Sequence, residues 1–229
     1  IEYLGCTRQY SKSNWKLYFE NVKDPYHASL LHLFHTTFNI FRVGMKARSI
    51  PDANHGLHSI ITVTKPEVET DTAAAYSAQN IRSMDEGFAL EDPTLLGQIK
   101  EFDEMTTNHI QPIFPQLVVQ QIHNTLVARQ LLPKGPGNFE LVFHFFGYAD
   151  DTPELRELRM LQANLVGPAG YISMEDTEAT ELVQRGTVRD GDKHSYIAMA
   201  REAPDQQDTV ITENLIRRFW VGYQKLMGY

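Results

Sequence analysis

The sequence lacks several features that identify particular classes of protein. Its 229 residues include a single cysteine, Cys6, so this chain alone can build neither an internal disulfide nor a cysteine-rich zinc or iron–sulfur site. No apolar run approaches the roughly 20 residues of a membrane-spanning helix, and the opening IEYLGCTRQY lacks the pattern of a signal peptide. We therefore expect an intracellular protein with no membrane span, and any metal that it binds must have nitrogen and oxygen ligands.

Basic segments are also lacking. The formal net charge is −8 and no local run of lysine and arginine offsets it, so neither nucleic acid nor an anionic membrane surface is an expected partner. The hydrophobic content of 42% is ample for a buried core. The simplest expectation is one globular domain over residues 1–229.

The first half of the chain predicts a helix interrupted at a proline, followed by short strands. Ser13 is placed to cap a helix that begins near residue 14. Pro25 has no backbone donor and disfavours helical geometry in the residue before it, so the helix should stop or kink there and restart over residues 26–38. Residues 39–88 mix short β-prone stretches, such as 57–64, with turn formers.

The middle of the chain predicts a β-hairpin. Residues 113–132 and 139–148 are rich in β-branched and aromatic side chains, and Lys-Gly-Pro-Gly-Asn at 134–138 is a turn sequence. The two segments should therefore pair as antiparallel strands. Residues 89–111 carry few strong signals apart from scattered helix formers.

Three helices are predicted in the last third of the chain. The first covers residues 153–166, with Thr152 as its cap, the second covers 172–186, and the third carries an apolar stripe that follows Thr212 as its cap. Strands followed by segregated helices predict an α+β fold. The C-terminal helix should lie against the sheet.

Three histidines and two acids crowd into residues 20–35, ENVKDPYHASLLHLFH. Two neutral imidazoles and one carboxylate are the ligand set that binds ferrous iron for oxygen chemistry. In a straight helix a five-residue spacing turns His27 and His32 about 140° apart, so they would converge only through a distortion of the kind that Pro25 and a bound ion could impose. Asp24, three residues before His27, is placed to accept its second ring N–H. The alternative is that these are ordinary histidines of an amphipathic helix.

The same stretch lies within a longer motif that resembles a known family. The resemblance is to the catalytic domain of the large (alpha) subunit of Rieske non-haem iron aromatic ring-hydroxylating oxygenases, and it is carried by Asn14-Trp15-Lys16, Glu20-Asn21, Asp24, Tyr26-His27 and His32. It implies that His27 and His32 are iron ligands. It also implies that Asp24 links the iron site to the electron-donating cluster, and that Asn21 forms hydrogen bonds near the iron.

The third ligand of the family is an aspartate that follows a helix and a Gly-Pro-Ala-Gly-like turn. This sequence has that turn at residues 167–170, and Glu175 and Asp176 come shortly after it. We match Asp176 to the ligand. Glu175 is the nearest competitor, and spacing alone does not choose between the two.

The resemblance extends from about residue 10 to residue 225 and implies a helix-grip (Bet v1/START-like) fold, in which an antiparallel sheet wraps around a long C-terminal helix. The Cys-x-His and Cys-x-x-His pairs that hold the Rieske [2Fe–2S] cluster are absent, so the Rieske domain is not in this chain. The family further implies a bacterial, cytoplasmic homotrimer of alpha subunits with small beta subunits (α3β3). Electrons would come from NADH through a reductase and a ferredoxin.

Details of Asn-Trp-Lys-Leu-Tyr-Phe-Glu-Asn and Leu-Leu-His-Leu-Phe-His-Thr-Thr-Phe are most similar to the branch that acts on aromatic carboxylates, including salicylate 5-hydroxylases and anthranilate dioxygenases. The implied reaction uses Fe(II) and O2, with salicylate to gentisate as the preferred case and anthranilate or benzoate as alternatives. Burying a substrate carboxylate without a donor is costly. The candidate donors are Gln121, Arg129, Gln130 and Ser173. The rival hypotheses are a non-catalytic domain that binds an apolar ligand and a hydrolytic zinc site.

Overall fold

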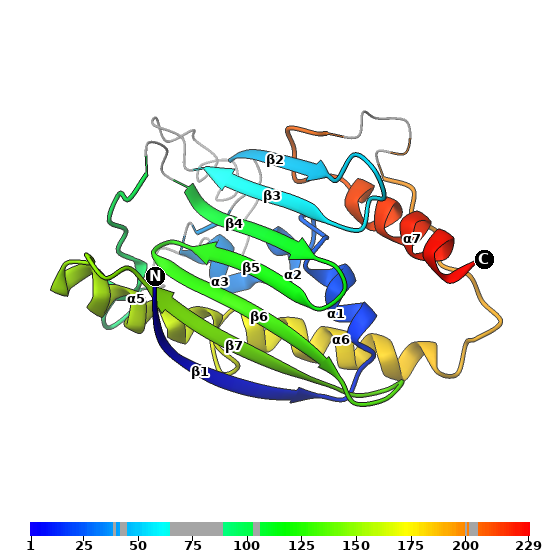
Figure 1. The fold of residues 1–229 in the computed structure, drawn as a ribbon, viewed down its shortest axis with the longest axis horizontal. Helices are drawn as coiled ribbons and strands as arrows, with labels where there is room; N and C mark the ends of the chain where they lie inside the picture. Colours follow the sequence, from blue (N-terminus) through cyan, green and yellow to red (C-terminus); the bar gives the residue numbers. More distant parts are fainter. Residues whose placement is uncertain (39, 42–44, 65–88, 103–105, 200, 202–205) are drawn as a thin grey trace.

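Seven antiparallel strands form one sheet, in the spatial order β1-β7-β6-β5-β4-β3-β2. The computed structural model describes residues 1–38, 40–41, 45–64, 89–102, 106–199, 201 and 206–229. Figure 1 shows most of the helices gathered behind the sheet, with α7 beside the β2 end. In chain order the elements are β1 (Glu2–Ser11), α1 (Trp15–Asn21), α2 (Ala28–Leu31), α3 (Leu33–Thr37), β2 (Lys46–Pro51), β3 (Ser59–Thr64), the 3₁₀ helix η2 (Pro93–Leu96), β4 (Thr106–Ile113), β5 (Leu117–Ile122), β6 (Thr125–Pro133), β7 (Phe139–Gly147), α5 (Pro153–Val166), α6 (Ser173–Thr187) and α7 (Asn214–Met227).

The main core lies between one face of the sheet and the helices, which confirms the predicted α+β class. Alternate residues of β6 are buried, as expected for a strand with one covered face. Val127 and Leu131 of this strand belong to the same cluster as Phe19 of α1 and Phe219 of α7. The aromatic rings of Phe19 and Phe219 have centroids 5.4 Å apart, so the first and last helices share one core.

The predicted hairpin is confirmed for β6 and β7, but the segment 113–132 is not one strand. It divides into β5 and β6 at His123 and Asn124, where His123 has a φ of 49°. The Asn124 amide holds this reversal in place because its Oδ1 accepts from the backbone N–H of Ile99 at 2.9 Å. Because residues 113–132 are β-prone throughout, the sequence did not reveal the turn at His123 and Asn124. The sequence also gave no signal for β4, the strand that precedes β5.

The helix starts are partly as predicted. Thr152 caps α5 by accepting from the N–H of Leu155 at 3.2 Å, as expected. The prediction that Ser13 caps the first helix is wrong: Asn14 is the N-cap of α1, while the buried Ser13 hydroxyl contacts Ser11. The second predicted helix is confirmed as α6. None of the helices within the described residues is both long enough and apolar enough to cross a bilayer.

The C-terminal helix α7 packs against the sheet and α1. Gly222 allows a close approach, since a Cβ at this position would lie 2.1 Å from the carbonyl oxygen of His55 in the β2–β3 connection. Trp220 donates its Nε1–H to Glu20 of α1 at 2.6 Å. The prediction that Thr212 caps this helix is wrong: the N-cap of α7 is Glu213, and Thr212 Oγ1 accepts from the N–H of Asn214 at 3.1 Å.

One lysine is fully buried in this core. Lys23 Nζ donates to the carbonyl of Leu57 at 3.0 Å and to Ser59 Oγ at 3.1 Å, at the start of β3. Burial lowers the pKa of Lys23 to about 7, even though the charge of Asp52 favours the protonated form. A neutral amine has two N–H donors, which match the two acceptors. The nearby ring faces of Phe19 and Phe219 favour the charged form, but burial outweighs them.

The stability of this chain should therefore rise with pH above neutrality. The pKa of Lys23 is about 7 in the folded state and roughly 10.4 in an unfolded chain, so the unfolded state binds more protons between these values. Below pH 7 the buried amine is charged and the desolvation cost is present in full. The unfolding free energy of the wild-type chain, relative to Lys23→Met, should increase from pH 7 to pH 10 by at most about 1.4 kcal/mol per pH unit. Urea titrations at several pH values test this, and a flat difference contradicts it.

Candidate metal centre

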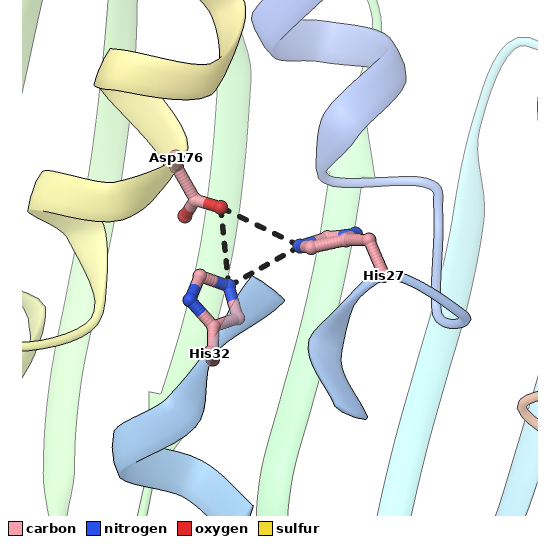
Figure 2. Close-up of side chains that lie close together, drawn as sticks. All are labelled: His27, His32 and Asp176. Atoms are coloured by element: carbon pink, nitrogen blue, oxygen red, sulfur yellow. Dashed lines mark hydrogen bonds and ion pairs between the residues drawn. The ribbon is translucent and has the colours of Figure 1, made fainter. Parts of the chain in front are cut away.

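Two histidines and an aspartate converge (Figure 2), and all three line one cavity. His27 immediately precedes α2, His32 lies between α2 and α3, and Asp176 is in the first turn of α6. His27 Nε2 and His32 Nε2 are 3.2 Å apart, and Asp176 Oδ1 lies 3.4 Å from the first and 3.1 Å from the second. Among the described residues, this is the group of three or more potential ligands that approach closely enough to hold an ion.

A break in the helix brings the two imidazoles together. The prediction of one continuous helix over residues 26–38 is wrong, because His32 has φ −85° and ψ 85° and separates α2 from α3. The five-residue spacing therefore does not impose the rotation of a straight helix. Asp24 fixes the start of this segment by accepting from the N–H of Tyr26 at 2.9 Å.

The turn between α5 and α6 places Asp176. Gly170 passes so close to the end of α5 that a Cβ would lie 2.2 Å from the carbonyl oxygen of Leu165. Ser173, at the start of α6, donates its hydroxyl to the carbonyl of Val166 at 2.9 Å. These contacts tie the first turn of α6 to the end of α5 and direct Asp176 toward the histidines.

His27, His32 and Asp176 stabilise one another's charged forms. Burial alone would lower the pKa of His27, but the carboxylates of Asp176 and Asp24 raise it to about 10. The pKa of His32 is also raised, with Asp176 outweighing the effect of burial. Burial opposes ionisation of Asp176, but the two histidines hold its pKa well below the usual value. A cation at this position would replace the proton that the imidazoles otherwise share with Asp176.

The ligand distances fit a single metal ion. Atoms at neighbouring corners of an octahedron about 2.1 Å from an ion lie about 3.0 Å apart, and those of a tetrahedron about 3.4 Å apart. The observed separations of 3.1, 3.2 and 3.4 Å fall in this range, and none approaches the roughly 4.2 Å of opposite octahedral corners. An ion held by these atoms would therefore have all three groups on one side. Two imidazoles and a carboxylate in this arrangement suit Fe(II).

Three polar side chains surround the candidate ligands. Asn21 Nδ2 donates to Asp176 Oδ1 at 2.9 Å. Glu175, the competitor for the third ligand position, instead lies 2.8 Å from His32 Nδ1, on the ring edge opposite the converging atoms. Asp24 Oδ2 is 3.6 Å from His27 Nδ1, which is an ion-pair distance rather than a direct hydrogen bond. Glu175 can thus fix the orientation and tautomer of His32.

The cavity beside the triad has a volume of about 550 Å³, its mouth included. Arg129 and Ser173 line it, as expected for contacts to a substrate, but Gln121 and Gln130 do not. Side chains alternate between the two faces of a strand, and the glutamines stand one position away from the inward-facing Gln120 and Arg129. The expectation that Gln121 and Gln130 line this cavity is therefore incorrect.

Three further buried polar residues line the cavity, and sequence reasoning missed two of them, Asn108 and Gln120. His35 lies beside His32, with ring centroids 4.8 Å apart and the rings tilted by 54°, and burial holds its pKa well below the usual value, so it is neutral. Asn108 of β4 and Gln120 of β5 also face the cavity. The period-two pattern of β5, with Val118 and Ile122 buried, could have identified Gln120 as an inward residue.

An antiparallel α+β domain in which two histidines and one carboxylate converge on an open position has the type of site found in non-haem iron oxygenases. The chain belongs to the family described as ring hydroxylating alpha subunit (catalytic domain), whose model matches residues 5–228. The family resemblance drawn from the sequence motif is thereby confirmed.

Particular relatives refine this result. The chain is 82% identical to the anthranilate 1,2-dioxygenase large subunit of Burkholderia cepacia and 33% identical to the large oxygenase component of salicylate 5-hydroxylase from a Ralstonia species. Both alignments cover 100% of this chain, with 54% and 53% of the relatives, so the chain spans about half the length of these proteins. Naphthalene 1,2-dioxygenase from Rhodococcus, in a structure with indole bound, has the same fold, with a TM-score of 0.75 at 18% identity over 99% of this chain and 56% of its own.

The two adjacent carboxylates of α6 provide a matched test of the candidate ligands. Asp176→Ala should abolish binding of Fe(II) to this chain, which has no cysteine cluster to hold other iron, and His27→Ala should do the same. Glu175→Ala should retain a site but weaken Fe(II) binding by about 10- to 100-fold, because only the orientation of His32 is affected. Bound iron is measured after anaerobic reconstitution, with circular dichroism as the control for folding. Full iron retention by Asp176→Ala or His27→Ala would refute the ligand assignment.

Proposed function

We propose that this chain is the catalytic domain of a terminal oxygenase that hydroxylates an aromatic carboxylate with dioxygen. His27, His32 and Asp176 would hold Fe(II), which when bound supplies the one-electron chemistry that dioxygen activation requires. The observation that carries the choice of substrate is the buried Arg129, which lines the same cavity as the candidate ligands.

Arg129 has no protein counter-ion among the described residues. Its side chain is buried, with the residue 3% exposed, and a guanidinium stays protonated in proteins. Its Nη1 donates to the hydroxyl of Tyr18, while its Nε has no hydrogen-bond partner. Burial raises the pKa of Tyr18, so this neighbour is a neutral phenol rather than a counter-ion. A substrate carboxylate would supply the missing negative charge and a bidentate acceptor.

The rest of the cavity suits an aromatic ring. Apolar side chains from the sheet and from the segment after α3 form much of the wall. They are Phe41, Ile61, Val63, Ile110 and Ile122. Such a wall would exclude water from the ring. The carboxylate would be held at Arg129 while the ring extends toward the triad.

Among aromatic acids, anthranilate is the first candidate. The sequence motif favoured salicylate, but the relative that is 82% identical over the whole chain is named as an anthranilate 1,2-dioxygenase, against 33% identity for the salicylate 5-hydroxylase. Both compounds have a carboxylate and a hydrogen-bonding group on neighbouring ring carbons. Hydroxylation of salicylate to gentisate and oxidation of benzoate remain the alternatives, and the product assay described below tests both.

The complete enzyme would need electrons from outside this domain. They would pass from NADH through a reductase and ferredoxin to a Rieske [2Fe–2S] cluster, which this chain, with its single exposed cysteine, does not hold. We place Asp24 on the route from the cluster to His27, since its side chain is 25% exposed and lies beside the ring. In a cytoplasmic homotrimer of alpha subunits, with or without small beta subunits, the Rieske cluster of a neighbouring subunit would lie next to Asp24.

A product assay tests the proposed function. The full-length oxygenase, with its electron-transfer partners and NADH, should convert anthranilate with consumption of oxygen, and salicylate and benzoate with lower kcat/KM. Metal analysis of the same preparation should find iron at the mononuclear site. Aromatic acids that bind without any oxygenated product would favour the non-catalytic binder, and zinc with a hydrolytic activity would favour the hydrolase.

Asp24→Asn should separate iron binding from turnover. Asparagine keeps the side-chain oxygen that accepts from Tyr26 N–H, so the turn before α2 should persist. It removes the negative charge beside His27, and this should slow electron delivery without emptying the site. We expect near-normal iron content with at least a roughly tenfold loss of kcat in the complete oxygenase, since partners outside the ligand shell typically matter by 10- to 100-fold. Unchanged single-turnover and steady-state rates would remove Asp24 from the electron route.

A further inference from the structure

Two amide side chains and one guanidinium form a diagonal row across the inner face of the sheet. In the register of β4 and β5, Asn108 lies opposite Ile122, two positions from Gln120. In the register of β5 and β6, Arg129 lies opposite Val118, which is two positions from Gln120 on the other side. Asn108, Gln120 and Arg129 therefore follow one another along a diagonal, each neighbour about 7–8 Å from the next at the backbone. All three line the candidate substrate cavity.

The two amides in this row have unused hydrogen-bond acceptors. Asn108 is 5% exposed and Gln120 is 3% exposed. Neither Oδ1 of Asn108 nor Oε1 of Gln120 has a hydrogen-bond partner among the described residues. A buried acceptor without a partner is unfavourable, so two of them on one cavity wall indicate a ligand that donates hydrogen bonds.

We infer that Asn108 and Gln120 form a subsite for an amino group adjacent to the carboxylate of the aromatic substrate. The inference rests on the proposed function, in which Arg129 holds that carboxylate. An aromatic amine has two N–H donors and can satisfy both acceptors, whereas a hydroxyl has one and an unsubstituted ring has none. The row therefore selects ortho-aminobenzoates above ortho-hydroxybenzoates, and these above benzoate.

The spacing of the row agrees with such a ligand. One amine nitrogen can bridge two oxygen atoms about 5 Å apart, because each N–H···O bond is about 2.9 Å long and the two N–H bonds diverge by about 120°. Long amide side chains on diagonal neighbours can reach this separation. Arg129 and Gln120 are adjacent in the row, as the carboxylate and the amine are adjacent on the ring. The inward alternation of β4 and β5 directs all of these groups to the cavity that also contains the triad.

Two near-isosteric substitutions test the subsite in the complete oxygenase. Gln120→Met and Asn108→Leu remove one acceptor each while keeping approximate volume and apolar packing. Each should lower kcat/KM for anthranilate by about tenfold or more, and leave kcat/KM for benzoate unchanged or higher, because benzoate leaves these acceptors unpaired in the wild type. Calorimetric dissociation constants for both acids, measured without dioxygen, should change in the same ratio. Gln111→Met, on the outer face of β4, is the matched control and should leave the ratio unchanged.

The ratio of kcat/KM for anthranilate to kcat/KM for benzoate distinguishes the ways in which the inference could fail. Equal losses for anthranilate and benzoate in both variants would overturn the amine subsite while leaving the oxygenase intact. A larger loss for benzoate would assign the amides to the carboxylate and would also overturn it. A wild-type enzyme that neither oxidises nor binds any of these acids would instead refute the proposed function, and the subsite with it.

Discussion

The closeness of one carboxylate oxygen to two imidazole nitrogens is the interaction on which the rest of the site depends. Asp176 Oδ1 lies within 3.4 Å of His27 Nε2 and His32 Nε2, and it also accepts from Asn21. These groups come from segments about 150 residues apart in the chain. Their convergence connects α6 to the broken helical segment after α1, and all three candidate ligands line the cavity.

A buried cluster of this kind needs compensating charges and hydrogen bonds to be stable. Burying an anion and two imidazoles is favourable only if their charges and hydrogen bonds are balanced, and the raised pKa of His27, about 10, indicates how strongly a positive charge is favoured there. A metal ion supplies that charge without a proton. The neighbouring groups, Glu175 on His32 and Asp24 beside His27, then act on the outer edges of the two rings.

The sequence allowed the α+β class, the helices α5 and α6 and the three converging residues to be predicted, for different physical reasons. Thr152 and Pro153 are local signals that act within one helical turn, so α5 was accessible from sequence alone. The triad was found through a motif and not through geometry, since spacing argued against convergence of the histidines. The break at His32, which resolves that conflict, depends on contacts with α6 and therefore leaves no local signature.

The cavity was harder to predict, because a strand changes face at every residue. Gln121 and Gln130 were one position away from Gln120 and Arg129, and a single step of this kind transfers a side chain from the cavity to the outer face. The turn at His123 and Asn124 was also missed. Without it the register of β5 and β6 cannot be assigned, so the diagonal row formed by Asn108, Gln120 and Arg129 cannot be identified. Register, rather than composition, determines which polar residues face the substrate.

Under the proposed function, the charges that line the cavity favour a monoanionic aromatic substrate. Asp176 is already balanced by the histidines, and by a metal ion when one is bound, so it cannot also neutralise Arg129. Arg129 lines the cavity, and within the described part of the chain its side-chain hydrogen-bond partner is the neutral Tyr18. A cationic ligand would add to this positive charge, and a neutral hydrocarbon would leave it buried without compensation. A ring with one carboxylate neutralises Arg129 and places its apolar part against the isoleucines and valine of the sheet, so the same arginine that makes the empty cavity costly makes an aromatic acid the favoured occupant.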